Sequence, residues 1–287
     1  MNKLVLTIDD LVERDGLYYK KFTDTPFTGD ITGENVCTFK NGKKEGYWIE
    51  YWNTQELNYK GTFKNGKKDG YWINYYSNGN VWEKGNYKNG KKEGSWIKYF
   101  VDGQLGYKGD FKNGKKEGYW IEYHDQLPFT KSLKNLHKYH HIKLKQLKYE
   151  GYFKNNKKEG SWKEYHENGE LNGKGDYKNN KKEGSWVWYW DNGELVRNCE
   201  YKNGNLEGKM VSYWDDGQLW EKYEIINGKK EGLFIVYWNN GNIWAKGNYK
   251  NGKKEGSWKT YNWDGTFGDE TLDYPCGNFK NDKKISD

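Results

Sequence analysis

Pairs of adjacent lysines recur along the sequence and are its most regular groups that could bind a charged ligand. The pairs begin at Lys43, Lys67, Lys91, Lys115, Lys157, Lys181, Lys229 and Lys253. Ammonium groups aligned in a row attract phosphate, on nucleic acid or on the headgroups of acidic phospholipids. An acidic residue follows every pair, as Glu45 follows the first, and the net charge is only +7. Solvated turns therefore explain the pairs as well as a basic binding ridge does.

A second basic segment, residues 127–148, carries six lysines, and no acidic residue lies between Asp125 and Glu150. Its leucines fall near helical spacing, so a short basic amphipathic helix is one interpretation and a solvated loop is the other. Aromatic side chains beside such a segment are of the type that carries binding energy. We expect an acidic protein surface to contact Tyr123, Phe129, Lys131, Lys134, Lys138, Tyr139, Lys143 and Lys145.

Metal and catalytic chemistry have little support in the sequence. His137 and His141 would share one face of a helix, but no carboxylate or cysteine nearby completes a metal site. The three cysteines, Cys37, Cys199 and Cys276, are scattered and lack metal or redox spacing. No glycine-rich phosphate loop leads into a helix, and no nucleophile stands beside an evident base. We expect no catalytic residues, no metal and no cofactor.

One pattern of 24 residues accounts for almost all of the chain and must position any of these groups. The aromatic or aliphatic residue that opens each copy is Phe39, Phe63, Tyr87, Phe111, Phe153, Tyr177, Tyr201, Ile225 or Tyr249, and a half copy begins at Phe279. The spacing departs from 24 only twice, to 42 and to 30 residues. A fixed period of this length indicates a repeat array in which each copy stacks on its neighbours.

Each copy contains two turn signals, such as Asn65-Gly66 and Asn78-Gly79. Asn-Gly between apolar runs predicts a hairpin with a type I′ turn, because both central residues of that turn need positive φ. Two turns in each copy imply two strands. No segment between turns is long enough for a crossover helix, so neighbouring strands should be antiparallel.

A two-residue turn at Asn78-Gly79 also predicts which residues face each other across the strands. The predicted pairs are Trp72 with Gly85, Gly70 with Tyr87, Tyr76 with Val81 and, in variant copies, Met210 with Tyr223 and Trp186 with Cys199. Large rings would lie over small residues on one face of the sheet. Tyr75 recurs in every copy with the opposite parity, so either the second face is also aromatic or a bulge intervenes.

The segment Gly85-x-Tyr87-x-x-Gly90-x-x-x-Gly94 resembles the core of the MORN repeat (membrane occupation and recognition nexus). The resemblance covers residues 39–287. The repeat here is longer, and Trp96 stands where the common pattern has a final glycine. The longer form is similar to bacterial MORN-variant repeats, some of which are labelled antitoxins. The resemblance implies scaffolding and contacts with proteins, sometimes with phospholipids, and does not imply catalysis.

We therefore expect an all-β fold, an elongated single-layer antiparallel sheet of stacked β-hairpins. The expected organisation is an N-terminal cap at 1–38, four repeats at 39–126, the basic insertion at 127–148, and five repeats with a C-terminal half repeat at 149–287. Leu4, Leu6, Ile8 and Leu11 are expected to form a cap strand against the first copy. With 16 Trp and 26 Tyr, the sheet should be held by stacked rings rather than by a thick aliphatic core.

The sequence thus favours a non-catalytic binding protein, and the resemblance makes an inhibitor or antitoxin-like partner of another protein its leading specific form. A peripheral membrane adaptor that binds acidic phospholipids through its lysines is the alternative, and a nucleic-acid binder is a weaker one. The first residues contain no long apolar run, and no stretch approaches the ~20 apolar residues of a membrane span. We expect a cytoplasmic protein.

Overall fold

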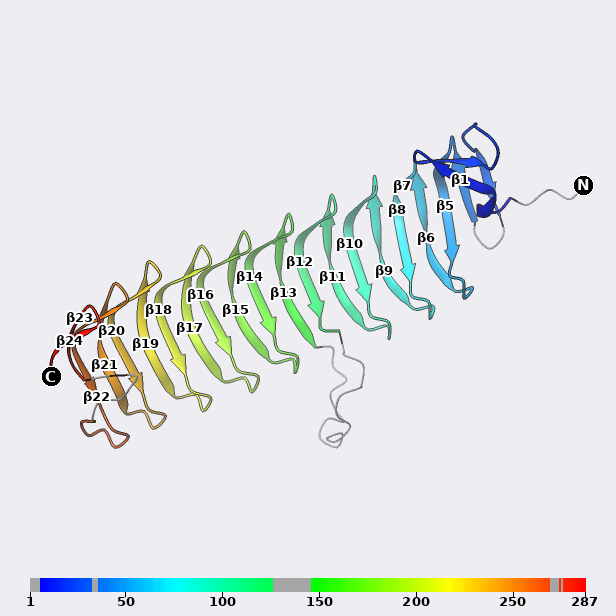
Figure 1. Ribbon diagram of the computed structural model, residues 1–287. Helices are drawn as coiled ribbons and strands as arrows, with labels where there is room; N and C mark the ends of the chain where they lie inside the picture. Colours follow the sequence, from blue (N-terminus) through cyan, green and yellow to red (C-terminus); the bar gives the residue numbers. More distant parts are fainter. Residues whose placement is uncertain (1–5, 33–35, 126–145, 269–273, 275) are drawn as a thin grey trace, which may run out of the picture. The chain divides into compact units, whose positions relative to one another are not determined.

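The computed structural model describes residues 6–32, 36–125, 146–268, 274 and 276–287. Contacts divide the chain into two compact units, one of residues 1–145 with 153–156 and one of residues 146–152 with 157–287. In each unit antiparallel strands follow one another in chain order (Figure 1). Apart from the single 3-10 turn η1 (Ile8–Asp10), the described residues contain no helix.

The first unit begins with a separate two-stranded sheet and continues as one sheet of paired strands. Its strands are β1 (Leu11–Arg14), β2 (Leu17–Lys20), β3 (Gly29–Ile31), β4 (Val36–Lys40), β5 (Lys43–Tyr51), β6 (Leu57–Lys64), β7 (Lys67–Lys68), β8 (Gly70–Tyr75), β9 (Val81–Lys88), β10 (Lys91–Tyr99), β11 (Leu105–Lys112) and β12 (Lys115–Tyr123). From β3 onward each strand pairs with the next, except that β6 pairs with both the short β7 and β8.

The second unit repeats the same hairpins, and β13 contributes residues to both units. The strands are β13 (Leu147–Lys154), β14 (Lys157–Tyr165), β15 (Leu171–Lys178), β16 (Lys181–Tyr189), β17 (Leu195–Lys202), β18 (Asn205–Tyr213), β19 (Leu219–Ile226), β20 (Lys229–Tyr237), β21 (Ile243–Lys250), β22 (Lys253–Thr260), β23 (Gly277–Lys280) and β24 (Lys283–Ser286). The predicted all-β fold of stacked antiparallel hairpins with a period of about 24 residues is confirmed.

The turn that carries the lysine pair is the type I′ turn that the sequence predicts. Asn65 and Gly66 have φ angles of 50° and 77°, and the same values recur from copy to copy. Where the second residue is not glycine, as at Asn156, asparagine adopts the left-handed conformation with φ 66°. Asparagine tolerates this region better than other side chains do, which explains why it replaces glycine here.

The second turn of each copy differs from the prediction. The Gly79 N–H donates to the carbonyl of Tyr76 at 3.0 Å, and Gly79, with φ 84°, is the single left-handed residue of this turn. A type I′ turn needs two such residues. The register shifts after Asn74, so that Tyr75 lies opposite Val81. The predicted pair of Tyr76 with Val81 is therefore wrong, and the bulge explains the parity of Tyr75.

The remaining predicted pairs are confirmed. Trp72 lies opposite Gly85 and Gly70 opposite Tyr87. In the variant copies Trp186 lies opposite Cys199 and Met210 opposite Tyr223. The tryptophans of this series, such as Trp72 and Trp96, are fully buried although the sheet has a single layer.

Each buried tryptophan leans over the strand that precedes it. A Cβ added to Gly61 would lie 2.3 Å from the Trp72 ring, so only glycine fits beneath that ring. The Trp72 Nε1–H donates to the carbonyl of Thr62 at 3.0 Å, which fixes the orientation of the ring. Phe63 meets the same ring edge to face, with centroids 4.9 Å apart.

The contact between tryptophan and glycine also bears on the copies in which both residues are replaced. Met210 and Phe234 occupy the repeat position of the buried tryptophan. The residues that take the place of glycine on the preceding strand are Cys199 for Met210 and Tyr223 for Phe234. The rings of Tyr223 and Phe234 are tilted, with centroids 5.7 Å apart. In the two copies of the second unit that have a side chain in place of glycine at this site, a smaller residue replaces tryptophan, which suits close packing. The first unit keeps tryptophan in the equivalent pair, Cys37 and Trp48.

The acidic residue after each lysine pair, and Glu207 at the same repeat position, accepts a hydrogen bond from the turn of the next copy. The Asn113 N–H donates to Glu93 Oε2 at 2.8 Å, and Asn89 donates to Asp69 Oδ2 at 2.9 Å. The same bond joins Asn65 to Glu45, Asn155 to Glu117, Asn179 to Glu159, Asn203 to Glu183, Asn227 to Glu207, Asn251 to Glu231 and Asn281 to Glu255. We call this series the carboxylate ladder.

Replacing Glu93 with alanine is expected to lower the free energy of unfolding by about 1 kcal/mol, because the Asn113 N–H loses its charged acceptor. Glu93→Asp should lose much less, since Asp69 makes the same bond in another copy. Urea unfolding of the three proteins measures the difference. Equal losses in both variants would contradict the role of the carboxylate.

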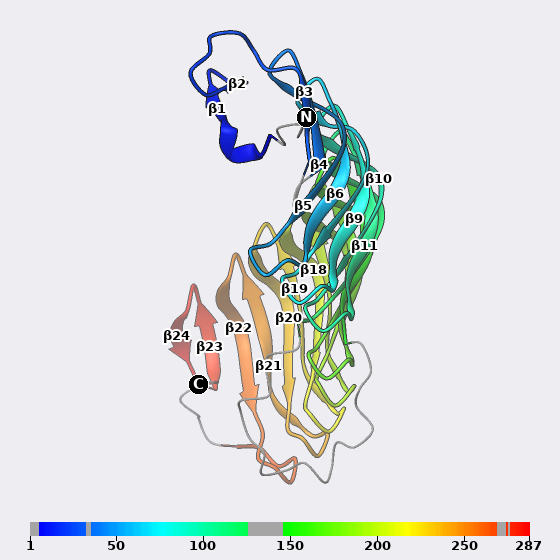
Figure 2. The same cartoon turned by 90° about the vertical axis from the view of Figure 1, so that its right-hand side faces the viewer.

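The N-terminal cap does not form the strand that the sequence predicts. Leu4 lies outside the described residues, and Leu11 begins β1, which pairs with β2 in the separate sheet. The strand that pairs with the first copy is β3, through Ile31 and Cys37. Figure 2 shows the β1–β2 hairpin beside the first strands of the sheet rather than in its plane. The buried aromatic rings of successive copies, such as Phe39 and Trp48, form a row that we call the ring row. Apolar cap residues cover its first ring, as Tyr18 packs against Phe39.

Candidate binding surfaces

The two lysines of each pair point to different places. The first lysine of every pair is exposed at the turn, whereas the second is half-buried. The Lys68 Nζ lies 4.1 Å from the centroid of the Trp72 ring and 5.3 Å from that of Tyr87. Lys44, Lys92, Lys116, Lys158, Lys182, Lys230 and Lys254 lie over rings in the same way. The lysine pairs therefore supply one exposed ammonium group per copy and one that covers the ring row by cation–π contact.

Burial affects the charge state of several of these inner lysines. It lowers the pKa of Lys68, Lys182 and Lys230, because a desolvated ammonium group is less stable. Other inner lysines have carboxylate partners at hydrogen-bonding distance. Lys92 pairs with Glu83 at 2.7 Å, and the Tyr107 hydroxyl donates to the same carboxylate at 3.1 Å.

The opposite face of the sheet in the first unit is rich in exposed tyrosine. Tyr47, Tyr71 and Tyr119 each precede a buried tryptophan, so they point away from the ring row. They are 52%, 51% and 41% exposed. On the same face lie the half-buried Ile49, Ile73, Ile97 and Ile121 and the lysines Lys60, Lys84 and Lys108. We call these residues together the tyrosine surface.

The tyrosine surface was not predicted from the sequence, although a signal for it exists. The residue before each tryptophan is tyrosine in three copies of the first unit but serine at Ser95, Ser161, Ser185 and Ser257. The structure needs no aromatic ring at this exposed position. Tyrosine and isoleucine on an uncovered sheet face are typical of protein interfaces.

Of the predicted contact residues, the structure describes only Tyr123, which is half-buried at the end of β12. Phe129, Lys131, Lys134, Lys138, Tyr139, Lys143 and Lys145 lie outside the described residues. Tyr123 follows Tyr119 and Ile121 along the same strand and so adjoins the tyrosine surface in sequence. The contact that these residues are expected to make stays a prediction.

Within the described ranges, no three His, Cys, Asp or Glu side chains gather as metal ligands would. His137 and His141 lie outside those ranges. A ring nitrogen of His166 lies 2.9 Å from the carbonyl oxygen of Tyr189 and so joins two successive copies. Cys37 is buried as a free thiol, and burial raises its pKa to about 11, which makes it a weak nucleophile.

Copies of one hairpin that stack in chain order define a β-hairpin repeat protein. Five segments, residues 68–89, 158–179, 182–203, 206–227 and 230–251, match the family described as the MORN repeat variant. These five segments are thus MORN repeats of the variant type. The family is generally non-enzymatic, and its repeats are consistent with a protein that binds other molecules. No helix of the described residues is long and apolar enough to span a membrane.

Comparison with individual proteins adds little to the family match. No curated protein matches the chain. Among solved structures, a chain in the "Crystal Structure of TcdB2-TccC3-Cdc42" is similar at 10% identity and a TM-score of 0.18. The similarity covers 80% of this chain but only 14% of that chain. A TM-score this low supports no argument about fold or function.

Proposed function

We propose that the chain is a non-catalytic protein-binding protein and that its partner contacts the tyrosine surface of the first unit. The observation that carries the proposal is the row of exposed tyrosines on a sheet face that the described residues leave uncovered. Tyrosine buries a large rigid area at low entropy cost and keeps a hydroxyl group for hydrogen bonds, so it is enriched where binding energy concentrates.

The charge of this face favours an acidic partner. Lys60 and Lys84 lie among the tyrosines and isoleucines, and their ammonium groups lie over Tyr75 and Tyr99, with Nζ 5.9 Å and 5.4 Å from the ring centroids. Complementary charge raises the rate of encounter and selects among partners more than it adds affinity. An inhibitor or antitoxin-like role is the specific form that we propose, on the basis of the resemblance to bacterial MORN-variant proteins.

Replacing Tyr47, Tyr71 and Tyr119 together with serine is expected to weaken partner binding more than tenfold, about 1.4 kcal/mol. Serine occupies this position in other copies, so the fold should persist. The partner would be captured from the native cell and titrated against both proteins. Leu233→Ser is the matched control, because Leu233 holds the same repeat position in the second unit and is 55% exposed. Unchanged affinity of the triple variant would place the contact elsewhere.

Replacing residues 127–147 with an Asn-Gly turn tests the predicted part of the contact. Neighbouring copies need only a turn at this point, so the shortened chain should fold. Partner affinity is expected to fall more than tenfold, about 1.4 kcal/mol, because five of the six lysines are lost together with Phe129 and Tyr139, and only Lys148 remains. A shortened protein that folds and binds as tightly as the original would remove this segment from the site.

A second candidate function is adhesion to acidic phospholipids. The observation that favours it is the exposed first lysine of each pair, which recurs at the same turn of successive copies within each unit. Binding of this kind weakens steeply with salt. Flotation with phosphatidylserine vesicles at low and high salt separates the two functions. Salt-sensitive flotation that survives the triple tyrosine substitution would favour the lipid function.

A further inference from the structure

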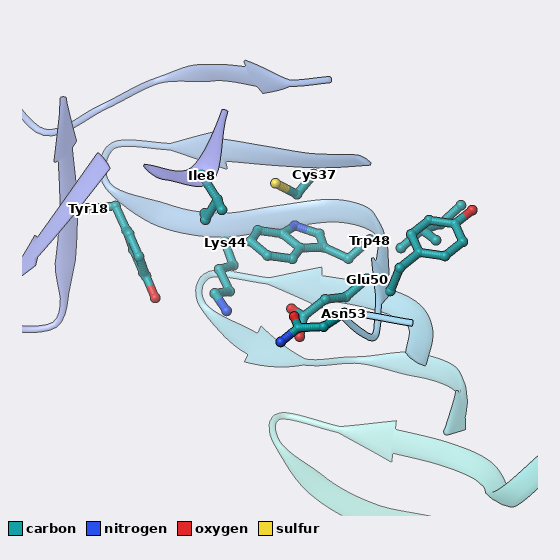
Figure 3. A pocket seen from close by; sticks show the side chains of 9 residues that line it. Ile8, Tyr18, Cys37, Lys44, Trp48, Glu50 and Asn53 are labelled. Atoms are coloured by element: carbon teal, nitrogen blue, oxygen red, sulfur yellow. The ribbon is translucent and has the colours of Figure 1, made fainter. Parts of the chain in front are cut away.

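A pocket of about 400 Å³ lies in the first unit, between the N-terminal cap and the first copy (Figure 3). The cap supplies Ile8 and Tyr18, while β5 and the loop after it supply Lys44, Trp48, Glu50 and Asn53. The walls thus combine apolar and aromatic side chains with one ammonium group, one carboxylate and one amide. Figure 3 shows the polar ends of Lys44, Glu50 and Asn53 on the same side of the Trp48 ring.

The lysine and the glutamate of this pocket form no ion pair, whereas residues at the same two repeat positions form one in later copies. Lysine and glutamate six residues apart form an ion pair in two later copies, Lys116 with Glu122 at 3.5 Å and Lys158 with Glu164 at 2.8 Å. Lys44 and Glu50 occupy the same two repeat positions. Among the described residues, no ion pair joins Lys44 to Glu50 or to another carboxylate.

A cap residue lies beside Lys44. The Lys44 Nζ lies 4.5 Å from the centroid of the Trp48 ring and 5.7 Å from that of Tyr18, which belongs to β2. The later copies have no cap residue beside the lysine. Burial, together with a hydrogen bond to Glu13, raises the pKa of Tyr18 to about 12, so its hydroxyl stays neutral at physiological pH.

The carboxylate is held in place independently of the lysine. Glu50 accepts hydrogen bonds from the Tyr59 hydroxyl and from the Asn58 Nδ2, the latter at 3.2 Å. Two donors fix its orientation and leave lone pairs for a further donor, since a carboxylate can accept about four hydrogen bonds. The pocket therefore presents a separated cation and anion, both half-buried, beside Trp48 and Ile8.

We propose that this pocket binds a free α-amino acid with an apolar side chain. The carboxylate of the amino acid pairs with the Lys44 ammonium group, and its ammonium group pairs with Glu50 and the Asn53 side chain. The side chain lies against Trp48 and Ile8. Ligand pockets have volumes of about 300–1,000 Å³, and this pocket falls within that range. The inference does not depend on the protein-binding proposal.

Calorimetric titration of the full chain with L-phenylalanine and L-leucine tests the site. At least one of them should bind saturably. The N-acetyl derivative of the better ligand lacks the ammonium group, and its carboxamide lacks the carboxylate, so each should bind at least tenfold more weakly. No saturable binding of either amino acid up to about 10 mM would overturn the proposal. A carboxamide that binds equally well would also overturn it, by indicating a peptide N-terminus as the ligand.

Two substitutions test whether Lys44 and Glu50 bind the charged groups of the amino acid. Lys44→Met keeps the apolar stem of the side chain, and Glu50→Gln keeps an acceptor for Tyr59 and Asn58; each should weaken binding at least tenfold. Lys158→Met is the matched control, because it removes a lysine from the closed pair of another copy and should leave binding unchanged. Unchanged binding in both folded pocket variants would overturn the proposal. Should either variant fail to fold, the comparison of ligands on the native chain still decides.

Discussion

Trp72→Ala is expected to lower the free energy of unfolding by about 3–5 kcal/mol. The ring is fully buried, it lies over Gly61, and it meets Phe63 and Tyr87 edge to face with centroids 4.9 Å and 6.0 Å apart. Its removal leaves a cavity that strands held in register on both sides cannot close. The Nε1 hydrogen bond to the carbonyl of Thr62 is lost as well.

The adjacent residue provides the control for this prediction. Tyr71→Ser changes the same strand but removes an exposed ring, so the change in stability should stay within about 0.5 kcal/mol. Equilibrium unfolding in urea, with the two transitions compared at equal slope, measures both. A loss at Trp72 no larger than the loss at Tyr71 would mean that the ring row does not stabilise the sheet.

Gly109→Ala is expected to destabilise the protein by about 3 kcal/mol, at the upper end of the range for overpacking. A Cβ at this position would lie 2.2 Å from the Trp120 ring. The ring cannot withdraw, because its Nε1–H is bonded to the carbonyl of Asp110 at 3.1 Å. Gly106→Ala is the matched control on the same strand, where the nearest atoms would lie at 3.4 Å.

Trp120→Met should partly rescue Gly109→Ala, because the native pair of Cys199 and Met210 has this combination of sizes. The double variant should lose less stability than the sum of the two single losses, by more than about 1 kcal/mol, as residues in direct contact do. Purely additive losses would show that the tryptophan and the glycine do not share one space.

The strand count and most of the register could be predicted because both follow from short-range rules. The Asn65-Gly66 turn fixes its own conformation, and the period of two in a strand then puts Trp72 opposite Gly85. The direction in which the Trp72 ring leans does not follow from any period. It depends on the side-chain torsions and on Gly61 of the preceding strand, so the contact that limits packing appears only in three dimensions.

The binding surfaces were harder to predict for a different reason. The two lysines of a pair, such as Lys67 and Lys68, are alike in sequence, but the turn sends one to solvent and one over the rings. The cap pocket depends on Tyr18, which lies outside the repeats and reaches Lys44 through chain folding. Residues 127–148 stand out in the sequence because they break the 24-residue period, whereas the tyrosine surface keeps the period and differs from other copies only by tyrosine in place of serine.

The carboxylate ladder gives the array a direction. The turn N–H of each copy donates to the carboxylate of the copy before it, as the Asn113 N–H donates to Glu93. The carboxylate of each copy in turn accepts the turn N–H of the copy after it. At the first copy a cap residue, Thr28, takes over by accepting the Asn41 N–H at 2.8 Å. A gene segment that encodes 24 residues can therefore be duplicated or deleted wherever it begins within the repeat. Each carboxylate then still lies beside the turn of the next copy. Proteins of this kind can change length in whole copies, so the reach of the binding surface can vary in evolution without a new fold.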